Sequence, residues 1–167
     1  IKMILDHYPV DSIRSRSINF FKNPWGKEII NVGGRMYSLG EIEHGILLGK
    51  LREKRAHFAI VCASLTCPDL AKKVYTPEKL YEQLDRQARL FINNPRKGYR
   101  IDRKEKILYV SKIFKWDKKS FSRGKEDIIP FILPYIESPQ DREFIKKGDF
   151  ELDFLDYDWD LNIYKGK

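Results

Sequence analysis

Residues 57–65 form a nearly continuous apolar run, and this run constrains the fold more than any other segment of the chain. A strand that is covered on both faces has such a pattern, so the run predicts a strand at the centre of a sheet. Residues 67–74 follow, with Pro68 near their start, where the missing N–H of proline costs nothing, and they predict a short helix. The chain therefore predicts a buried strand, a turn and a helix in succession.

Helical periodicity and capping residues predict the other helices. Ser38 and Glu41 have the spacing of a capping box, in which each side chain accepts a hydrogen bond from the backbone N–H of the other residue. A helix should therefore begin at this point. The predicted helices cover residues 1–8, 38–49, 77–93, 126–136 and 139–146.

Turn residues between alternating segments predict two hairpins. The paired segments are residues 27–32 with 36–39, around Gly33-Gly34, and residues 99–101 with 107–110. Residues 150–154 alternate as a half-buried strand does. Hairpins need antiparallel pairing, so the predicted fold class is α+β: a mostly antiparallel sheet with helices packed on it, in a single domain over residues 1–167.

The start of the chain, from Ile1 to Asp6, has the composition of a helix interior. We therefore expect an upstream N-terminal helical segment to precede it. The start has neither a basic region nor a small-residue cleavage site, so it is not a signal peptide. No apolar run approaches the ~18 residues of a membrane span, so no membrane span is predicted. The compartment stays open, because no targeting signal is present.

The chain is basic, with 32 Lys and Arg against 24 Asp and Glu and a formal net charge of +8. The basic residues alternate with apolar ones, which is typical of a solvated surface. A basic surface that docks an acidic partner is the alternative. A nucleic-acid partner is not expected, because no glycine-rich phosphate loop, zinc-finger spacing or aromatic RNA-binding motif accompanies the charge.

Cys62 and Cys67 are too few for a disulfide scaffold in a chain of 167 residues. Together with His57 they suggest part of a zinc site, but a structural site needs four ligands and the fourth is missing. The sequence therefore predicts neither a metal nor a cofactor.

Cys67 is the candidate nucleophile. On a strand, Cys62 faces away from His57, so we expect Cys62 in the core. At the start of a helix, unpaired backbone N–H groups favour the thiolate of Cys67 and can bind an oxyanion. The alternative for Cys67 is a small side chain that fills a tight turn before Pro68.

Glu43 is the candidate for orienting His57. It borders the apolar face of its helix, where a carboxylate needs a partner, and His57 would provide one. The alternative is that Glu43 lies at the rim and reaches water or a nearby Lys or Arg. His44 is expected on the helix surface.

Several motifs resemble one known family. They are SLGEIEH at residues 38–44, HFAIVCAS at 57–64, SLTCP at 64–68, VSKIFKW at 110–116 and YDWDLN at 157–162. These motifs resemble the family catalogued as domain of unknown function 547. The resemblance implies a thiol-hydrolase-like domain with a Glu-His-Cys arrangement, and by motif position it carries over Glu43, His57 and Cys67. The aromatic Trp-x-Asn-x-Tyr-Asn opening that is usual in the family is absent here.

The sequence therefore predicts a thiol-dependent hydrolase or acyltransferase that acts on an amide, a cysteine peptidase being one form. Cys67 would attack the carbonyl, His57 would take and return the proton, and Glu43 would orient the imidazole. The predicted partner is a peptide or amide substrate. The alternative is a non-enzymatic interaction domain with structural cysteines. The sequence indicates no oligomeric state.

Overall fold

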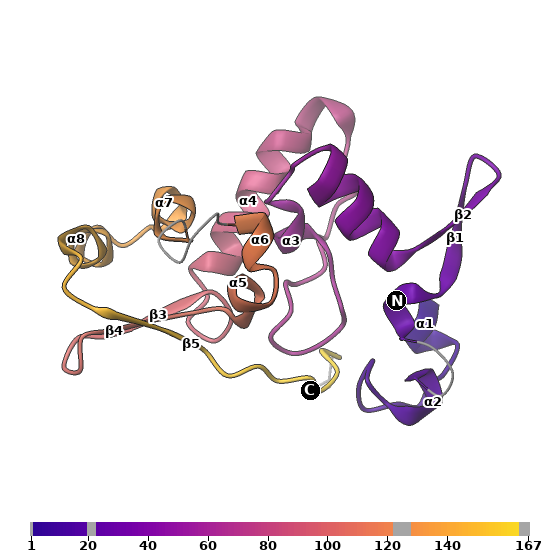
Figure 1. Ribbon diagram of the computed structural model, residues 1–167, viewed down its shortest axis with the longest axis horizontal. Coiled ribbons are helices and arrows are strands. Elements are labelled where there is room, and N and C mark those ends of the chain that lie inside the picture. Colours follow the sequence, from indigo (N-terminus) through magenta and orange to yellow (C-terminus); the bar gives the residue numbers. More distant parts are fainter. Residues whose placement is uncertain (1, 20–22, 122–127, 164–167) are drawn as a thin grey trace.

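Two small sheets and the helices between them build the fold in a computed structural model, which describes residues 2–19, 23–121 and 128–163 (Figure 1). The strands are β1 (Glu28–Val32), β2 (Arg35–Ser38), β3 (Tyr99–Asp102), β4 (Ile107–Val110) and β5 (Glu151–Phe154). The longer helices are η2 (Glu41–Lys50), α4 (Leu80–Ile92) and α8 (Pro139–Lys147). The shorter ones are α1 (Lys2–Leu5), α2 (Arg16–Asn19), η1 (Pro24–Gly26), α3 (Ala56–Ala59), η3 (Pro77–Lys79), α5 (Lys112–Trp116), α6 (Lys118–Phe121), α7 (Ile128–Ile132) and η5 (Leu133–Tyr135). This mixture confirms the α+β class.

The two predicted hairpins are present. β1 pairs antiparallel with β2, and Gly33 and Gly34 make the turn with φ values of 60° and 84°. Side chains rarely adopt such values, which explains the two glycines. β3 pairs antiparallel with β4 around the charged turn.

The third strand of the larger sheet runs in an unexpected direction. β5 pairs with β4 in parallel, and Leu152 lies opposite Leu108. Parallel neighbours need a long crossover, and α5 to α8 provide it between the two strands. The sheet is therefore mixed, with one antiparallel and one parallel pair.

Most predicted helices are confirmed, with shifted ends. Ser38 N donates to Glu41 Oε2 at 2.9 Å and Glu41 N donates to Ser38 Oγ at 3.1 Å, so the capping box exists. η2 then winds as a π-helix, in which Leu51 N donates to Ile46 O five residues earlier. α1 is shorter than predicted, and residues 126–127 of another predicted helix lie outside the described residues. None of the described helices is long and apolar enough to cross a membrane.

Residues 57–65 do not form the predicted central strand. α3 ends at Ala59, Ile60 is extended, and Ala63 has a left-handed φ of 66°. A short apolar run fits a buried helix as well as a buried strand, and here tertiary packing rather than neighbouring strands covers it. The strand prediction is therefore wrong. Within the described residues, the only β-bridge outside the named strands joins Ser64 to Leu161.

Residues 67–74 do not form the predicted helix either. Neighbouring side chains bind the carbonyls of this loop instead. Lys97 Nζ donates to Cys67 O at 3.0 Å, and Gln87 Nε2 donates to Asp69 O at 3.2 Å. Because these donors satisfy groups that a helix would pair internally, the loop needs no helical hydrogen bonds. The helix prediction is wrong, and Cys67 does not lie at a helix N-terminus.

An aromatic core joins α3 to the rest of the molecule. Phe58 is fully buried, and its ring centroid lies 5.1 Å from that of Phe91 and 6.0 Å from that of Phe131. Phe114 and Phe121 meet edge to face at 4.7 Å. Rings in such contact add to the free energy of apolar burial. The core therefore fixes the position of α3, and with it that of His57, which precedes Phe58.

The chain runs back from β5 to the N-terminal elements (Figure 1). We call residues 155–162 the C-terminal segment. On one side, Leu65 N donates to Asp160 O at 2.8 Å, and on the other, Ser12 Oγ donates to Trp159 O at 2.7 Å. The C-terminal segment thus ties the loop after α3 to the N-terminal elements.

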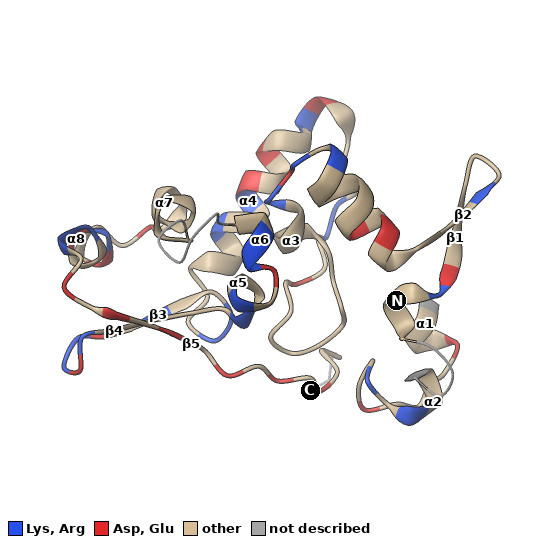
Figure 2. Ribbon diagram, in the orientation of Figure 1, with Lys and Arg blue, Asp and Glu red and all other residues tan. Residues whose placement is uncertain are grey.

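Charged residues are spread over many elements (Figure 2). Lys and Arg appear on α4, α6, α8 and the β3–β4 turn, whereas Asp and Glu appear along β5 and the C-terminal segment. Such a distribution is typical of a solvated surface.

Gly98 allows α4 and β3 to approach closely, and we expect Gly98→Ala to destabilise the fold. A Cβ at this position would lie 2.1 Å from Ile92 O and 2.2 Å from Phe91 O, so backbone would have to move. We expect the free energy of unfolding in urea to fall by about 1–3 kcal/mol. Gly45→Ala is the matched control, because a Cβ there meets nothing within 4 Å. Equal losses in the two variants would contradict the expectation.

Candidate active site

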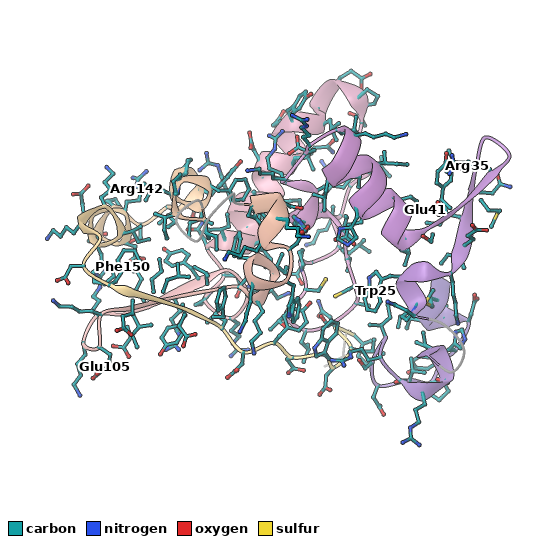
Figure 3. All side chains as sticks on the ribbon, in the orientation of Figure 1. Trp25, Arg35, Glu41, Glu105, Arg142 and Phe150 are labelled. Atoms are coloured by element: carbon teal, nitrogen blue, oxygen red, sulfur yellow. The ribbon has the colours of Figure 1, made fainter. Side chains whose placement is uncertain are left out.

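A pocket of about 920 Å³ opens between the N-terminal elements and the loop that follows α3. Trp25, labelled in Figure 3, lies on the N-terminal side. Glu43 of η2 and His57 of α3 contribute to the pocket wall. The loop adds Cys62 and Cys67. The residues predicted to be catalytic therefore all line one pocket.

His57 lies between two carboxylates. Its Nδ1 lies 3.7 Å from Glu43 Oε1, and its Nε2 lies 2.9 Å from Asp117 Oδ2. The second contact is short but lacks the direction of a hydrogen bond, and Nε2 has no hydrogen-bond partner among the described residues. The imidazole also packs on Phe121, with ring centroids 4.6 Å apart. Glu43 thus meets His57, while each ring nitrogen faces a carboxylate rather than a sulfur.

Burial changes the proton affinity of both partners. It lowers the pKa of His57 from 6.5 to about 4, although the Asp117 carboxylate acts in the opposite direction. Burial raises the pKa of Glu43; His44 opposes this rise, and the negative charges of Asp117 and Cys62 add to it. His57 is therefore neutral at neutral pH, and Glu43 holds a proton more readily than an exposed glutamate. In the described part of the chain, no group of three His, Cys, Asp or Glu side chains is arranged to hold a metal ion.

The two cysteines belong to one hydrogen-bond network. Cys67 Sγ accepts a hydrogen bond from Cys62 N at 2.8 Å, which closes the loop between them. Hydrogen bonding between the thiol groups lowers the pKa of Cys62 to about 5 and raises that of Cys67. Of the two thiols, Cys62 is therefore the one that loses its proton more readily.

Two hydroxyl groups surround the Cys62 sulfur. Ser64 Oγ and Tyr157 OH each lie 3.2 Å from Cys62 Sγ, and Ser64 Oγ donates to Tyr157 OH at 2.9 Å. After the thiol of Cys67, these donors are the next groups that lower the pKa of Cys62 against the effect of burial. Burial raises the pKa of Tyr157, so its hydroxyl keeps its proton.

The two sulfurs differ from expectation in their surroundings. Strand alternation predicts Cys62 in the core. This prediction is wrong, because no strand forms here and Cys62 is a half-buried residue of the pocket wall. Cys67 is only 4% exposed, and the helix expected to activate it is absent. The nucleophilic role of Cys67 stays a prediction. His44, expected on the helix surface, is exposed but also reaches to 3.9 Å from Asp117.

Aromatic side chains form one wall of the pocket. The ring centroid of Tyr157 lies 4.6 Å from that of Trp116 and 4.7 Å from that of Trp159. Trp25 meets Trp159 edge to face at 6.4 Å. The rings come from three parts of the chain, and their mutual contact makes a continuous apolar surface beside Cys62.

The family described as a protein of unknown function, DUF547, matches residues 1–92, more than half of the chain. The chain belongs to this family. No curated protein and no solved structure matches it. The residues matched to DUF547 include Glu43, His57 and both cysteines, whereas Asp117 and Tyr157 lie beyond them.

Asp117 and Tyr157 are site residues that the sequence does not indicate. Asp117 directly follows VSKIFKW at residues 110–116, and Tyr157 opens YDWDLN at residues 157–162. No local pattern connects either residue to Cys62. Only the return of the C-terminal segment and the packing of α5 bring them to the pocket.

We expect the buried His57 to make the protein less stable in acid. The unfolded chain binds a proton on His57 near pH 6.5, whereas the folded protein does so only near pH 4. Between these values the unfolded state binds more protons, so stability falls as the pH decreases, by about 3 kcal/mol at most.

His57→Asn removes this titration, and urea denaturation at about pH 7 and about pH 4.5 measures its contribution. We expect the variant to lose less stability than the parent between the two pH values. His7→Asn is the control, because it removes a histidine outside the pocket. Equal losses in the parent and in His57→Asn would contradict a neutral, buried His57.

Proposed function

We propose that this chain is a thiol-dependent hydrolase or acyltransferase that acts on amides. One observation carries the proposal: Cys62, whose pKa is lowered to about 5, lies half-buried on the wall of a pocket. The thiolate is the nucleophilic form of cysteine, and such a pKa makes it the main form at neutral pH. A structural cysteine has no need of this environment.

The surrounding groups suit the steps of an acyl transfer. The Cys62 thiolate attacks the carbonyl carbon, and the Tyr157 hydroxyl donates to the oxygen that becomes negative. The C–N bond then breaks, and the amine leaves with a proton from Glu43, whose raised pKa suits it to this transfer. Water or an acceptor amine attacks the thioester, returning the proton to Glu43 and releasing the thiolate.

Two further residues position the reacting groups. Cys67 keeps a proton and stabilises the negative charge on Cys62. His57 lies against Glu43 and Asp117 and holds the carboxyl of Glu43 at the pocket wall. The proposal therefore differs from the one based on sequence, in which Cys67 attacks and His57 moves the proton.

Alkylation by iodoacetamide across a range of pH, read at each cysteine by mass spectrometry, tests which sulfur is the thiolate. We expect Cys62 to react with a midpoint near pH 5, because its pKa is lowered. Cys67 should stay protected beyond its ordinary pKa of 9.0. If Cys67 reacted faster than Cys62, Cys67 rather than Cys62 would be the nucleophile.

The same preparation, tested on a panel of acyl p-nitroanilides, links the thiolate to a reaction. We expect Cys62→Ser to abolish hydrolysis while the fold is kept, as judged by circular dichroism. If both cysteines are inert and no amide is cleaved, the non-enzymatic interaction domain becomes the better description.

Tyr157→Phe tests the hydroxyl beside the sulfur. The variant removes a donor 3.2 Å from Cys62 Sγ, so we expect the alkylation midpoint of Cys62 to rise by about one pH unit, which corresponds to about 1.4 kcal/mol. Tyr135→Phe is the control, because it removes a hydroxyl that donates to Asp85 outside the pocket. An unchanged midpoint in Tyr157→Phe would show that the thiolate does not depend on this hydroxyl.

A further inference from the structure

The pocket is unlike the rest of the protein in its charge. The chain carries a formal net charge of +8, yet none of the described residues that line the pocket is Lys or Arg. Two carboxyl groups, Glu43 and Asp117, face the same space. The pocket is therefore a region of negative potential within a basic molecule.

No fixed cation on the pocket wall balances these carboxylates. The wall residue between them, His57, is 4% exposed and neutral at neutral pH. Its Nε2 has no hydrogen-bond partner among the described residues, although it is buried. The other neighbour, His44, is largely exposed and lies 3.9 Å from Asp117. Asp117 Oδ2 accepts a hydrogen bond from Ser120 Oγ at 2.6 Å, but this neutral donor does not balance its charge. A buried nitrogen without a hydrogen-bond partner beside such a carboxylate indicates that a ligand completes this site.

The opposite wall is suited to a cation as well. Trp116 stacks on Trp159 with ring centroids 5.5 Å apart, and Tyr157 lies against both rings. The face of such a ring attracts positive charge, most strongly in tryptophan. The protein already uses this property, because the guanidinium of the exposed Arg14 lies 4.9 Å from the centroid of Trp159.

We propose that the pocket binds an alkylammonium group, held between the carboxylate of Asp117 and the aromatic wall of Trp116, Tyr157 and Trp159, with the carboxyl of Glu43 beside it. In a pocket of about 920 Å³, room remains for the acyl part of a substrate next to Cys62. The assignment of this cation to the substrate rests on the proposed function, whereas the binding of the cation does not. The substrate class is then an amide that carries a positively charged alkylammonium group.

Choline and its neutral isostere 3,3-dimethylbutan-1-ol test the proposal. The two molecules have nearly the same shape, and only choline is charged. All three tryptophans of the chain line the pocket, so intrinsic fluorescence reports occupancy directly. We expect choline to bind at least about tenfold more tightly than the isostere. Equal affinities, or no binding of choline, would overturn the proposal.

Single substitutions locate the site. Trp116 is 52% exposed, so Trp116→Leu should fold normally and weaken choline binding by about tenfold. Asp117→Asn removes one of the carboxylates and should weaken it by a similar factor. Glu105→Gln is the matched control, since Glu105 lies in the β3–β4 turn far from the pocket (Figure 3). Unchanged affinity in both pocket variants would also overturn the proposal.

The outcome separates this proposal from the proposed function. Choline binding without a reactive Cys62 would support the cation site and contradict the hydrolase. A reactive Cys62 without choline binding would support the hydrolase and contradict the cation site. Where both hold, bound choline should slow the alkylation of Cys62, because both occupy one pocket.

Discussion

The docking of the C-terminal segment, residues 155–162, onto the loop after α3 is the interaction on which the pocket depends. Leu65 N donates to Asp160 O, and Ser12 Oγ donates to Trp159 O, so the segment bridges two parts of the chain that otherwise lie apart. In both contacts the C-terminal segment contributes a backbone carbonyl, which does not depend on the identity of its own side chains. Because its peptide groups hold the segment in place, the side chain of Tyr157 is free to lie beside Cys62.

A second constraint is the shape of the loop itself. Ala63 has a left-handed φ, and Cys62 N donates to Cys67 Sγ, so the chain turns back on itself between the cysteines. A residue without a β-branch tolerates such a φ at a cost of order 1 kcal/mol. The turn brings two thiols into one network, in which the pKa of Cys62 is lowered and that of Cys67 is raised. A regular strand or helix over the same residues would have separated them.

The electrostatics of the pocket and of the surface differ in origin. The basic surface is a sum of many scattered Lys and Arg, each solvated (Figure 2). Inside the pocket, burial raises the pKa of Glu43 and lowers that of His57, so both groups shift toward their neutral forms. The pKa of the Cys62 thiol is nevertheless lowered, because hydrogen-bond donors outweigh the burial that acts on the sulfur. The pKa values in this site therefore follow from burial and from the placement of hydrogen-bond donors, more than from the amino-acid types alone.

Elements whose stability is local follow directly from the amino-acid sequence. The capping box of Ser38 and Glu41, the glycine turn between β1 and β2, the hairpin of β3 and β4, and α8 all arise from residues within a few positions of one another. The sequence also singled out Glu43 and His57, which meet in the structure. Long-range packing instead sets the form of residues 57–74, the parallel pairing of β5, and the positions of Asp117 and Tyr157 at the pocket. The physical reason is that an apolar run is equally well buried as strand or helix, so partners distant in sequence choose between them. The pKa of each sulfur depends first on the hydrogen bond between Cys62 and Cys67 and then on burial, neither of which is visible in the spacing of the two residues.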